Sequence, residues 1–143
     1  MTCNIERLLF LCEDLRERLG AGLPAGTLQV TLFVPSVDRD GLPIDQAFWR
    51  EEALRVFGRL FRGATAFPPG RGVWRNDARG GELVFDDTVL VPPYVDPTVL
   101  HESSLCELRR FLHRLGQEAR QGEVGSVAGG NYYCITEFDN AKE

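Results

Sequence analysis

Residues 57–95, FGRLFRGATAFPPGRGVWRNDARGGELVFDDTVLVPPYV, contain the end of a predicted helix followed by a long, bent β-hairpin. Gly63 is expected to end the helix. The Pro-Pro-Gly at 68–70 is expected to bend the first strand, because proline cannot donate a hydrogen bond to a neighbouring strand. The turn NDARGG (76–81) leads into the second strand, ELVFDDTVLV (82–91). The rest of the chain is then expected to supply helices that cover this hairpin.

Periodic apolar residues predict the elements on either side of the hairpin. Helical spacing predicts helices at 45–61 and from Asp96-Pro97 to Gly122, where aspartate would cap the helix and proline would occupy its first position. Alternation predicts a strand at 27–34 and a closing hairpin in which AGGN (128–131) joins EVGSV to YYCITEF. The predicted order is β-α-β-β-α-β with one extra edge strand. This order indicates an α+β, ferredoxin-like fold with an antiparallel sheet and two helices on one side.

A further helix is predicted at residues 4–19. Its apolar stripe is Ile5, Leu8, Cys12, Leu15 and Leu19, and residues 9–11 widen the apolar surface beyond one stripe. A helix that is apolar on two sides lies between two surfaces. Both surfaces could belong to its own domain, where the helix would cover the open sheet face, or one could belong to a second copy. We expect a single domain, 1–143, made of an N-terminal helix (1–22), a ferredoxin-like body (27–138) and a frayed tail (139–143).

The composition is that of a soluble globular protein, with 43% hydrophobic and 26% charged residues. A net charge of −5 argues against nucleic-acid binding, which needs clustered positive charge. The sequence has neither an apolar run long enough to span a membrane nor a signal peptide, so a cytoplasmic location is expected. The four cysteines lack CxxC spacing, which is typical of free thiols, and Cys106 and Cys134 are expected to be buried. No cofactor and no metal are expected, because His101 and His113 are twelve residues apart and are predicted to be surface residues.

Several polar and aromatic residues are candidates for a ligand site. At the end of the third predicted helix lies a polar cluster made of Gln117, Glu118, Gln121 and Glu123. This cluster could bind a polar ligand, or could cap the helix and fix the next strand. Trp74 could pack in the core or against a sheet face, or could act as a stacking platform. Because Asp86 and Asp87 are adjacent on a strand, one of them is expected to point inward. The ligand-binding candidates are Trp74, Asp86, Gln117, Glu118, Gln121, Glu123 and Tyr132.

Short motifs along the chain resemble a family of small uncharacterised bacterial proteins. They are GAT (63–65), PPGRGVW (68–74), GELVFDDTVLV (81–91), LRRFLHRLGQEARQGEV (108–124) and YYCI (132–135). The resemblance implies a bacterial protein and agrees with the ferredoxin-like fold. No activity is assigned to the family, so the resemblance implies no chemistry.

Two functions remain open from the sequence. The first is a cytosolic, self-associating interaction module, which would bind as a homodimer or to a protein partner through the N-terminal helix or the open sheet face. The alternative is a small enzyme that uses the sheet face, either of the dimeric α/β-barrel type or a metal-dependent ribonuclease. Acidic residues around an open pocket would favour the enzyme, whereas a flat exposed apolar surface would favour the module.

Overall fold

The computed structural model describes residues 15–140, which form one antiparallel sheet with helices packed on it. The strands pair in the order β2-β3-β1-β5-β6, and β4 pairs with the start of β1. The expected α+β class and antiparallel pairing are confirmed. The elements are β1 (Leu28–Val34), α2 (Gln46–Phe61), β2 (Gly70–Asn76), β3 (Glu82–Val91), β4 (Tyr94–Val95), α3 (Glu102–Glu118), β5 (Val124–Ala128) and β6 (Asn131–Ile135), with short 3-10 turns at Asp77–Arg79 and Pro97–Val99.

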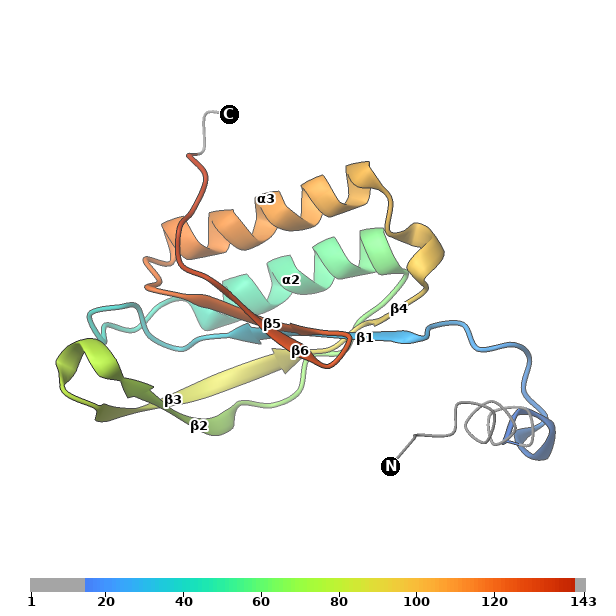
Figure 1. The fold of residues 1–143 in the computed structure, drawn as a ribbon, viewed down its shortest axis with the longest axis horizontal. Coiled ribbons are helices and arrows are strands. Elements are labelled where there is room, and N and C mark those ends of the chain that lie inside the picture. The colour runs from blue at the N-terminus through green and yellow to red at the C-terminus, as the bar shows by residue number, and fades with distance from the viewer. Residues whose placement is uncertain (1–14, 141–143) are drawn as a thin grey trace, which may run out of the picture.

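The core lies between the sheet and its two long helices. Figure 1 shows α2 and α3 side by side over one face of the sheet. Along the central strand β1, Val30, Leu32 and Val34 alternate with less buried residues and point towards these helices. The helices contribute Phe57 and Leu115, which are 1% and 0% exposed. Burial of each such side chain stabilises the fold by roughly 1.5–3 kcal/mol, so this layer holds the sheet in place.

The helix starts follow ordinary capping chemistry, but two predicted boundaries are wrong. Asp45 caps α2 as expected, because its carboxylate accepts a hydrogen bond from the Phe48 N–H at 3.0 Å. At the other end Arg62, not Gly63, takes the left-handed conformation, with φ of 70°. Asp96 caps only a 3-10 turn, and α3 starts after a new cap at His101. The chain leaves helical geometry between the two, since Leu100 has ψ of 72°.

The β2–β3 hairpin extends beyond the rest of the sheet. It pairs along its whole length from Gly70 and Thr88 to Asn76 and Glu82, whereas β1 pairs only with the last residues of β3. The far part of the hairpin therefore projects past the end of β1 (Figure 1). Trp74 lies there and is 53% exposed, which excludes packing in the core from the three possibilities that the sequence left open.

The described part of the N-terminal segment does not cover the sheet. Residues 15–19 are helical and lie beyond the start of β1 (Figure 1), where Leu15 and Leu19 are 55% and 75% exposed. The rest of the predicted apolar stripe, including Ile5 and residues 8–12, lies outside the described residues. Between residues 15 and 140, no helix has both the length and the apolar character needed to cross a membrane.

Candidate functional site

The face of the sheet opposite α2 and α3, called the open face below, carries a cluster of titratable side chains that could bind a ligand. Strand register shows which residues share it. Thr31 pairs with Val127, and Val127 pairs with Tyr132, so these side chains point the same way, as does that of Phe33 two residues along β1. Gly125 pairs with Cys134 on the same face. None of the described helices covers these residues (Figure 1).

Glu123, Tyr132 and Cys134 form a cluster of titratable groups at one end of β5 and β6. The Tyr132 hydroxyl donates a hydrogen bond of 2.9 Å to Glu123 Oε1. The edge of the Phe33 ring packs against the Tyr132 ring, with centroids 6.0 Å apart. Burial raises the pKa of the Tyr132 phenol, and the Glu123 carboxylate raises it further by accepting its proton in a hydrogen bond. The cluster therefore presents a phenol that keeps its proton at neutral pH, hydrogen-bonded to the Glu123 side chain beside an aromatic wall.

Gly125 makes this geometry possible. The Tyr132 side chain leans diagonally across β5 from its own position to reach Glu123, and it passes directly over Gly125. A Cβ atom built on Gly125 would lie 2.9 Å from Tyr132 Cζ and would overlap the hydroxyl oxygen. Any other residue at 125 would therefore displace the phenol from the carboxylate.

Cys134 completes the cluster, and its exposure corrects the expectation of a buried thiol. Both Cys106 and Cys134 are exposed. Cys106 is on α3, and Cys134 lies near the end of the edge strand β6. Desolvation raises the pKa of the Cys134 thiol, the Glu123 carboxylate raises it further, and the Tyr132 hydroxyl lowers it. The thiol is thus held in its protonated form near neutral pH.

We expect Glu123→Gln to lower the pKa of Cys134, because the substitution removes a negative charge that opposes formation of the thiolate. The measurement is the rate of iodoacetamide alkylation against pH, followed for individual peptides by mass spectrometry. The midpoint for the Cys134 peptide should move to lower pH, whereas that for Cys106 in the same sample should not move. An unchanged Cys134 profile would show that Glu123 does not act on this thiol.

Two other candidates on strands lie apart from this cluster. Trp74 is on the projecting part of the hairpin. Asp86 belongs to β3 and is half-buried beside the turn that follows β1. The Ser36 N–H of that turn donates to Asp86 Oδ1 at 3.2 Å, and the Ser36 hydroxyl donates to the same oxygen. Asp87 is exposed and pairs with Arg71. The prediction that one of the two aspartates points inward is only partly confirmed. Asp86 is half-buried, and its carboxylate accepts hydrogen bonds from Ser36 in the turn that follows β1.

Three polar candidates at the end of α3 have structural contacts instead. Gln121 is buried and its amide donates to the carbonyl oxygens of Val37 and Ala119 at 3.0 and 2.9 Å. Glu118 forms an ion pair with Arg114 one turn earlier on α3. The sequence left two interpretations of these polar residues, ligand binding or a structural role at the end of α3. These contacts, and those of Gln117 described next, support the structural role.

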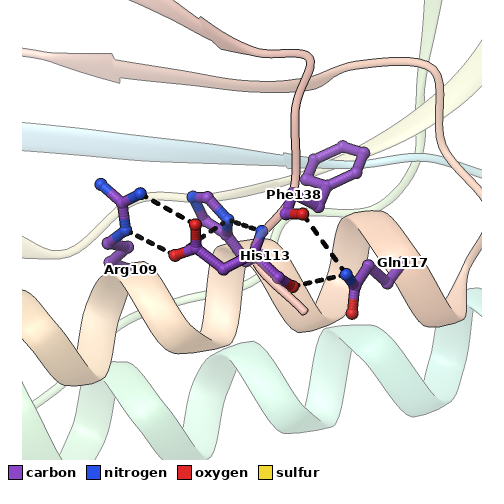
Figure 2. A network of polar contacts seen from close by, with 5 residues as sticks. Arg109, His113, Gln117 and Phe138 are labelled. Carbon is purple, nitrogen blue, oxygen red and sulfur yellow. Dashed lines mark hydrogen bonds and ion pairs between the residues drawn. The ribbon is translucent and has the colours of Figure 1, made fainter. Parts of the chain in front are cut away.

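Residues 137–140, called the C-terminal strap below, are bound along α3. Figure 2 shows Arg109, His113 and Gln117 at successive turns of α3, beside Phe138 of the strap. Arg109 and His113 contact Asp139, the next residue of the strap. Arg109 forms two hydrogen bonds to the Asp139 carboxylate, of 2.7 and 3.0 Å, which hold the pKa of that carboxyl below its ordinary value. The Asp139 N–H donates to His113 Nδ1 at 2.7 Å, and Gln117 donates to the carbonyls of residues 138 and 139.

The strap corrects one prediction. His113 is only 7% exposed and is not a surface residue, since the strap covers it. Asp139, the first residue of the predicted frayed tail, is bound by Arg109 and His113, and residues 141–143 of that tail lie outside the described residues. Between the strap, β6 and the first half of α3 lies a shallow groove of about 570 Å³, floored by Leu105, Leu108, Leu112 and Ile135. In the described part of the chain, no group of three or more His, Cys, Asp or Glu side chains is placed to hold a metal ion.

Three members of the open-face cluster were missed by the sequence analysis: Phe33, Gly125 and Cys134. The signal for Phe33 was present, since it is an apolar residue out of phase with the alternation of a central strand. Such a residue belongs to the second face of the sheet. Gly125 could have been found from the two-residue turn at 129–130, which fixes the pairing of β5 with β6 and places Gly125 opposite Cys134, on the same face as Tyr132 and diagonal to it.

Comparison with known proteins adds information about the fold. No protein-family model matches the chain, and no curated protein matches it. Among solved structures, phage SAM lyase in complex with S-methyl-5'-thioadenosine superposes with a TM-score of 0.60 and 19% sequence identity, over 81% of this chain and 94% of that chain. Phage SAM lyase in its apo state matches the same shares of both chains at 19% identity, with a TM-score of 0.52. The fold resembles that of phage SAM lyase.

This likeness corrects the first functional hypothesis. Both neighbours are structures of an enzyme, which overturns the interpretation of the chain as a non-enzymatic interaction module. The alternative drawn from the sequence, a small enzyme that uses its sheet face, agrees better with these neighbours. The exposed acidic and aromatic cluster on the open face agrees with it as well.

Proposed function

We propose that this chain is a small enzyme that binds S-adenosylmethionine or a closely related nucleoside and breaks its carbon–sulfur bond. The observation that carries the proposal is the likeness to phage SAM lyase, which extends over 94% of that chain. We place the site at the Glu123, Tyr132 and Cys134 cluster, with Phe33 as its aromatic wall. A neutral phenol, a carboxylate and aromatic rings suit a ligand with a flat base, a ribose and a positive sulfur.

The chemistry of the ligand suggests what each residue does. S-Methyl-5'-thioadenosine forms when the bond between the sulfur and the γ-carbon of the methionine part of S-adenosylmethionine breaks and the sulfur keeps the electron pair. The γ-carbon then gains a bond from the carboxylate oxygen of its own fragment, or the neighbouring carbon loses a proton to form a double bond, so no second reactant is needed. Because the positive charge on sulfur disappears in this step, a carboxylate placed at the sulfur would stabilise the substrate more than the transition state. We therefore assign Glu123 to the ribose hydroxyl groups, which acidic residues bind in other nucleotide sites. A carboxylate offers about four acceptor positions, so Glu123 can keep its bond from Tyr132 while it binds ribose.

The aromatic residues would bind the adenine ring. Phe33 and Tyr132 pack edge to face, which leaves a ring face of Tyr132 available on a side chain that is 55% exposed. Stacking of a base on an aromatic ring contributes about 1–3 kcal/mol. The adenine would therefore lie over β5 and β6, with the sulfur directed along the open face.

The proposal is tested with S-methyl-5'-thioadenosine and S-adenosylmethionine, by isothermal titration calorimetry and by chromatographic detection of the thioether product. We expect the wild-type chain to bind the first compound and to form it from the second. Glu123→Gln should weaken binding of both by about ten- to a hundredfold, since a hydrogen bond to a charged group contributes about 1.5–3 kcal/mol. Both compounds should be affected because they share the ribose.

The matched control is Glu118→Gln, which changes an exposed glutamate that pairs only locally with Arg114 on α3. It should bind both compounds as the wild type does. Absence of binding and of product with the wild-type chain would refute the proposed activity. A loss confined to S-adenosylmethionine in Glu123→Gln would instead place Glu123 at the amino-acid or sulfur end of the ligand.

Two finer points are part of the proposal. We propose that the fold is ferredoxin-like, supported by the order β2-β3-β1-β5 with α2 and α3 as the two crossover helices, and by β6 as the extra edge strand. Membership of the family of small bacterial proteins stays a prediction from the motifs between residues 63 and 135.

A further inference from the structure

The C-terminal strap continues directly from the strand that carries Tyr132 and Cys134. Strand β6 ends at Ile135, and the strap begins two residues later. We propose that the strap positions the ligand site from the helix side of the sheet, by fixing the far end of β6 to α3 and so holding Tyr132 and Cys134 beside Glu123. This role rests on the proposed function, since the ligand site is the same one.

Strand β6 has few other contacts that could hold it. Among the described strands it pairs with β5 alone, and four of its five residues are exposed. Within residues 131–140, the side chains that pack against the hydrophobic core are those of Ile135 and of Phe138 in the strap. The attachment of β6 to the rest of the fold therefore depends on β5 and on the strap.

The docking site for the strap is built into α3. Gly116 is buried in that helix, and the Phe138 ring lies so close to it that a Cβ atom on residue 116 would overlap the ring. The Phe138 ring also packs edge to face with that of His113, with centroids 6.0 Å apart. Glycine inside a helix is less stable than alanine, but at this position it allows the ring to reach the helix.

Polar contacts fix the strap next to this ring. Arg109 binds the Asp139 carboxylate through two hydrogen bonds, and the Asp139 N–H donates to His113 Nδ1. Gln117 donates to the carbonyl oxygen of Phe138 at 3.5 Å. The strap thus meets successive turns of α3 (Figure 2), which anchors the chain just beyond the end of β6.

The strap and the ligand site lie on opposite faces of the same strand. Tyr132 and Cys134 point to the open face, whereas Ile135 points towards the helices. The hydrogen bond from the Tyr132 hydroxyl to Glu123 reaches across β5, so it forms only while β6 keeps its position beside β5. Release of the strap would free the end of β6, and the phenol and the thiol would move away from Glu123.

The test compares Gly116→Ala with Gly58→Ala in the full chain. Both glycines lie inside helices, where alanine is the better helix former, but a Cβ atom at residue 58 meets no atom within 4 Å. Gly116→Ala should displace the Phe138 ring and weaken calorimetric binding of S-methyl-5'-thioadenosine by about tenfold, because Tyr132 would no longer be held for stacking on the base. Gly58→Ala should bind as the wild type does.

Alkylation of Cys134 by iodoacetamide reports the position of β6 without any ligand. Desolvation and the Glu123 carboxylate raise the pKa of this thiol, and the thiolate is the form that reacts. In Gly116→Ala the Cys134 peptide should therefore react several times faster at neutral pH. The Cys106 peptide in the same sample should keep its wild-type rate, which separates movement of β6 from a general loss of structure.

A charge reversal tests the same docking contact without a change to the helix glycine. Asp139→Arg puts a cation beside Arg109 and should reproduce the weaker binding and the faster reaction of Cys134. Addition of Arg109→Asp should reverse both effects, because opposite charges then meet again. S-Methyl-5'-thioadenosine has no net charge at neutral pH, so charges on the helix side should not act on it directly.

Wild-type binding and a wild-type rate for Cys134 in both Gly116→Ala and Asp139→Arg would overturn the proposal. A faster reaction of Cys134 with unchanged binding would overturn it too, as would a charge-reversed pair that does not recover. A wild-type chain that fails to bind the nucleoside, while Gly116→Ala still accelerates Cys134, would refute the proposed function and leave the hold of the strap on β6 intact.

Discussion

Gly125→Ala should leave the protein folded and should weaken its binding of S-methyl-5'-thioadenosine by about tenfold or more, because the displaced Tyr132 ring would no longer stack on the base, a contact that contributes about 1–3 kcal/mol. The added methyl group would occupy the space of the Tyr132 hydroxyl, so the phenol must swing away from β5. It would then lose its bond to Glu123, although neither of these residues is changed. The measurements are calorimetric binding and the ultraviolet titration of the phenol, whose pKa should fall towards its ordinary value.

Gly72→Ala is the matched control for this substitution. Gly72 also lies on a strand, and a Cβ there would meet its nearest neighbours, Asp86 O and Thr88 Oγ1, at an ordinary 3.6 Å. Its binding should equal that of the wild type. Equal binding by Gly125→Ala would mean that the position of Tyr132 does not matter to the ligand.

Phe57→Ala should lower the free energy of unfolding by about 3–5 kcal/mol, which is the usual cost of removing a buried aromatic ring. Phe57 is 1% exposed and packs against Phe61 and Phe111, with ring centroids 5.7 and 6.4 Å away. The alanine would leave a cavity between α2, α3 and the sheet. Since small domains are stable by only about 5–15 kcal/mol in total, urea unfolding should show a large shift of the midpoint.

Phe48→Ala provides the comparison on the same helix. Phe48 is 45% exposed, and its ring packs edge to face with that of Trp49, with centroids 5.1 Å apart. We expect a change of less than about 1 kcal/mol there, as for surface substitutions in general. Similar losses in the two variants would contradict the assignment of Phe57 to the centre of the core.

Much of the fold could be predicted because its pattern is local. The alternation of Val30, Leu32 and Val34 predicted a strand with one buried side, and the glycines at 129–130 predicted the closing hairpin. The errors concern features that depend on distant residues. Trp74 is exposed because it pairs with a part of β3 that extends past the end of β1. The sequence around residue 74 contains no information about the length of β1.

The site could be predicted only in part. Glu123 and Tyr132 were both candidates, but Glu118 and Gln121 are closer to Glu123 in sequence and still do not join it. The chain turns sharply after α3, where Arg120 has a positive φ of 51°, and this turn separates them. An open apolar sheet face is also compatible with a docking surface and with a ligand site, so the sequence could not choose between these functions. The likeness of the fold to phage SAM lyase agrees better with a ligand site, which is why that function is the one proposed.

Most residues of the open-face cluster lie in one short segment of the chain, and this affects how the ligand preference of such a protein can evolve. Gly125, Tyr132 and Cys134 belong to one hairpin, β5–β6, Glu123 comes directly before it, and the remaining member of the cluster, Phe33, comes from β1. Exchange of this single short segment between homologous proteins would transfer or erase the whole set of reactive groups, while the helices and the hydrophobic layer beneath stayed intact. Recombination could thus alter ligand preference in one event, without the loss of stability that scattered substitutions accumulate.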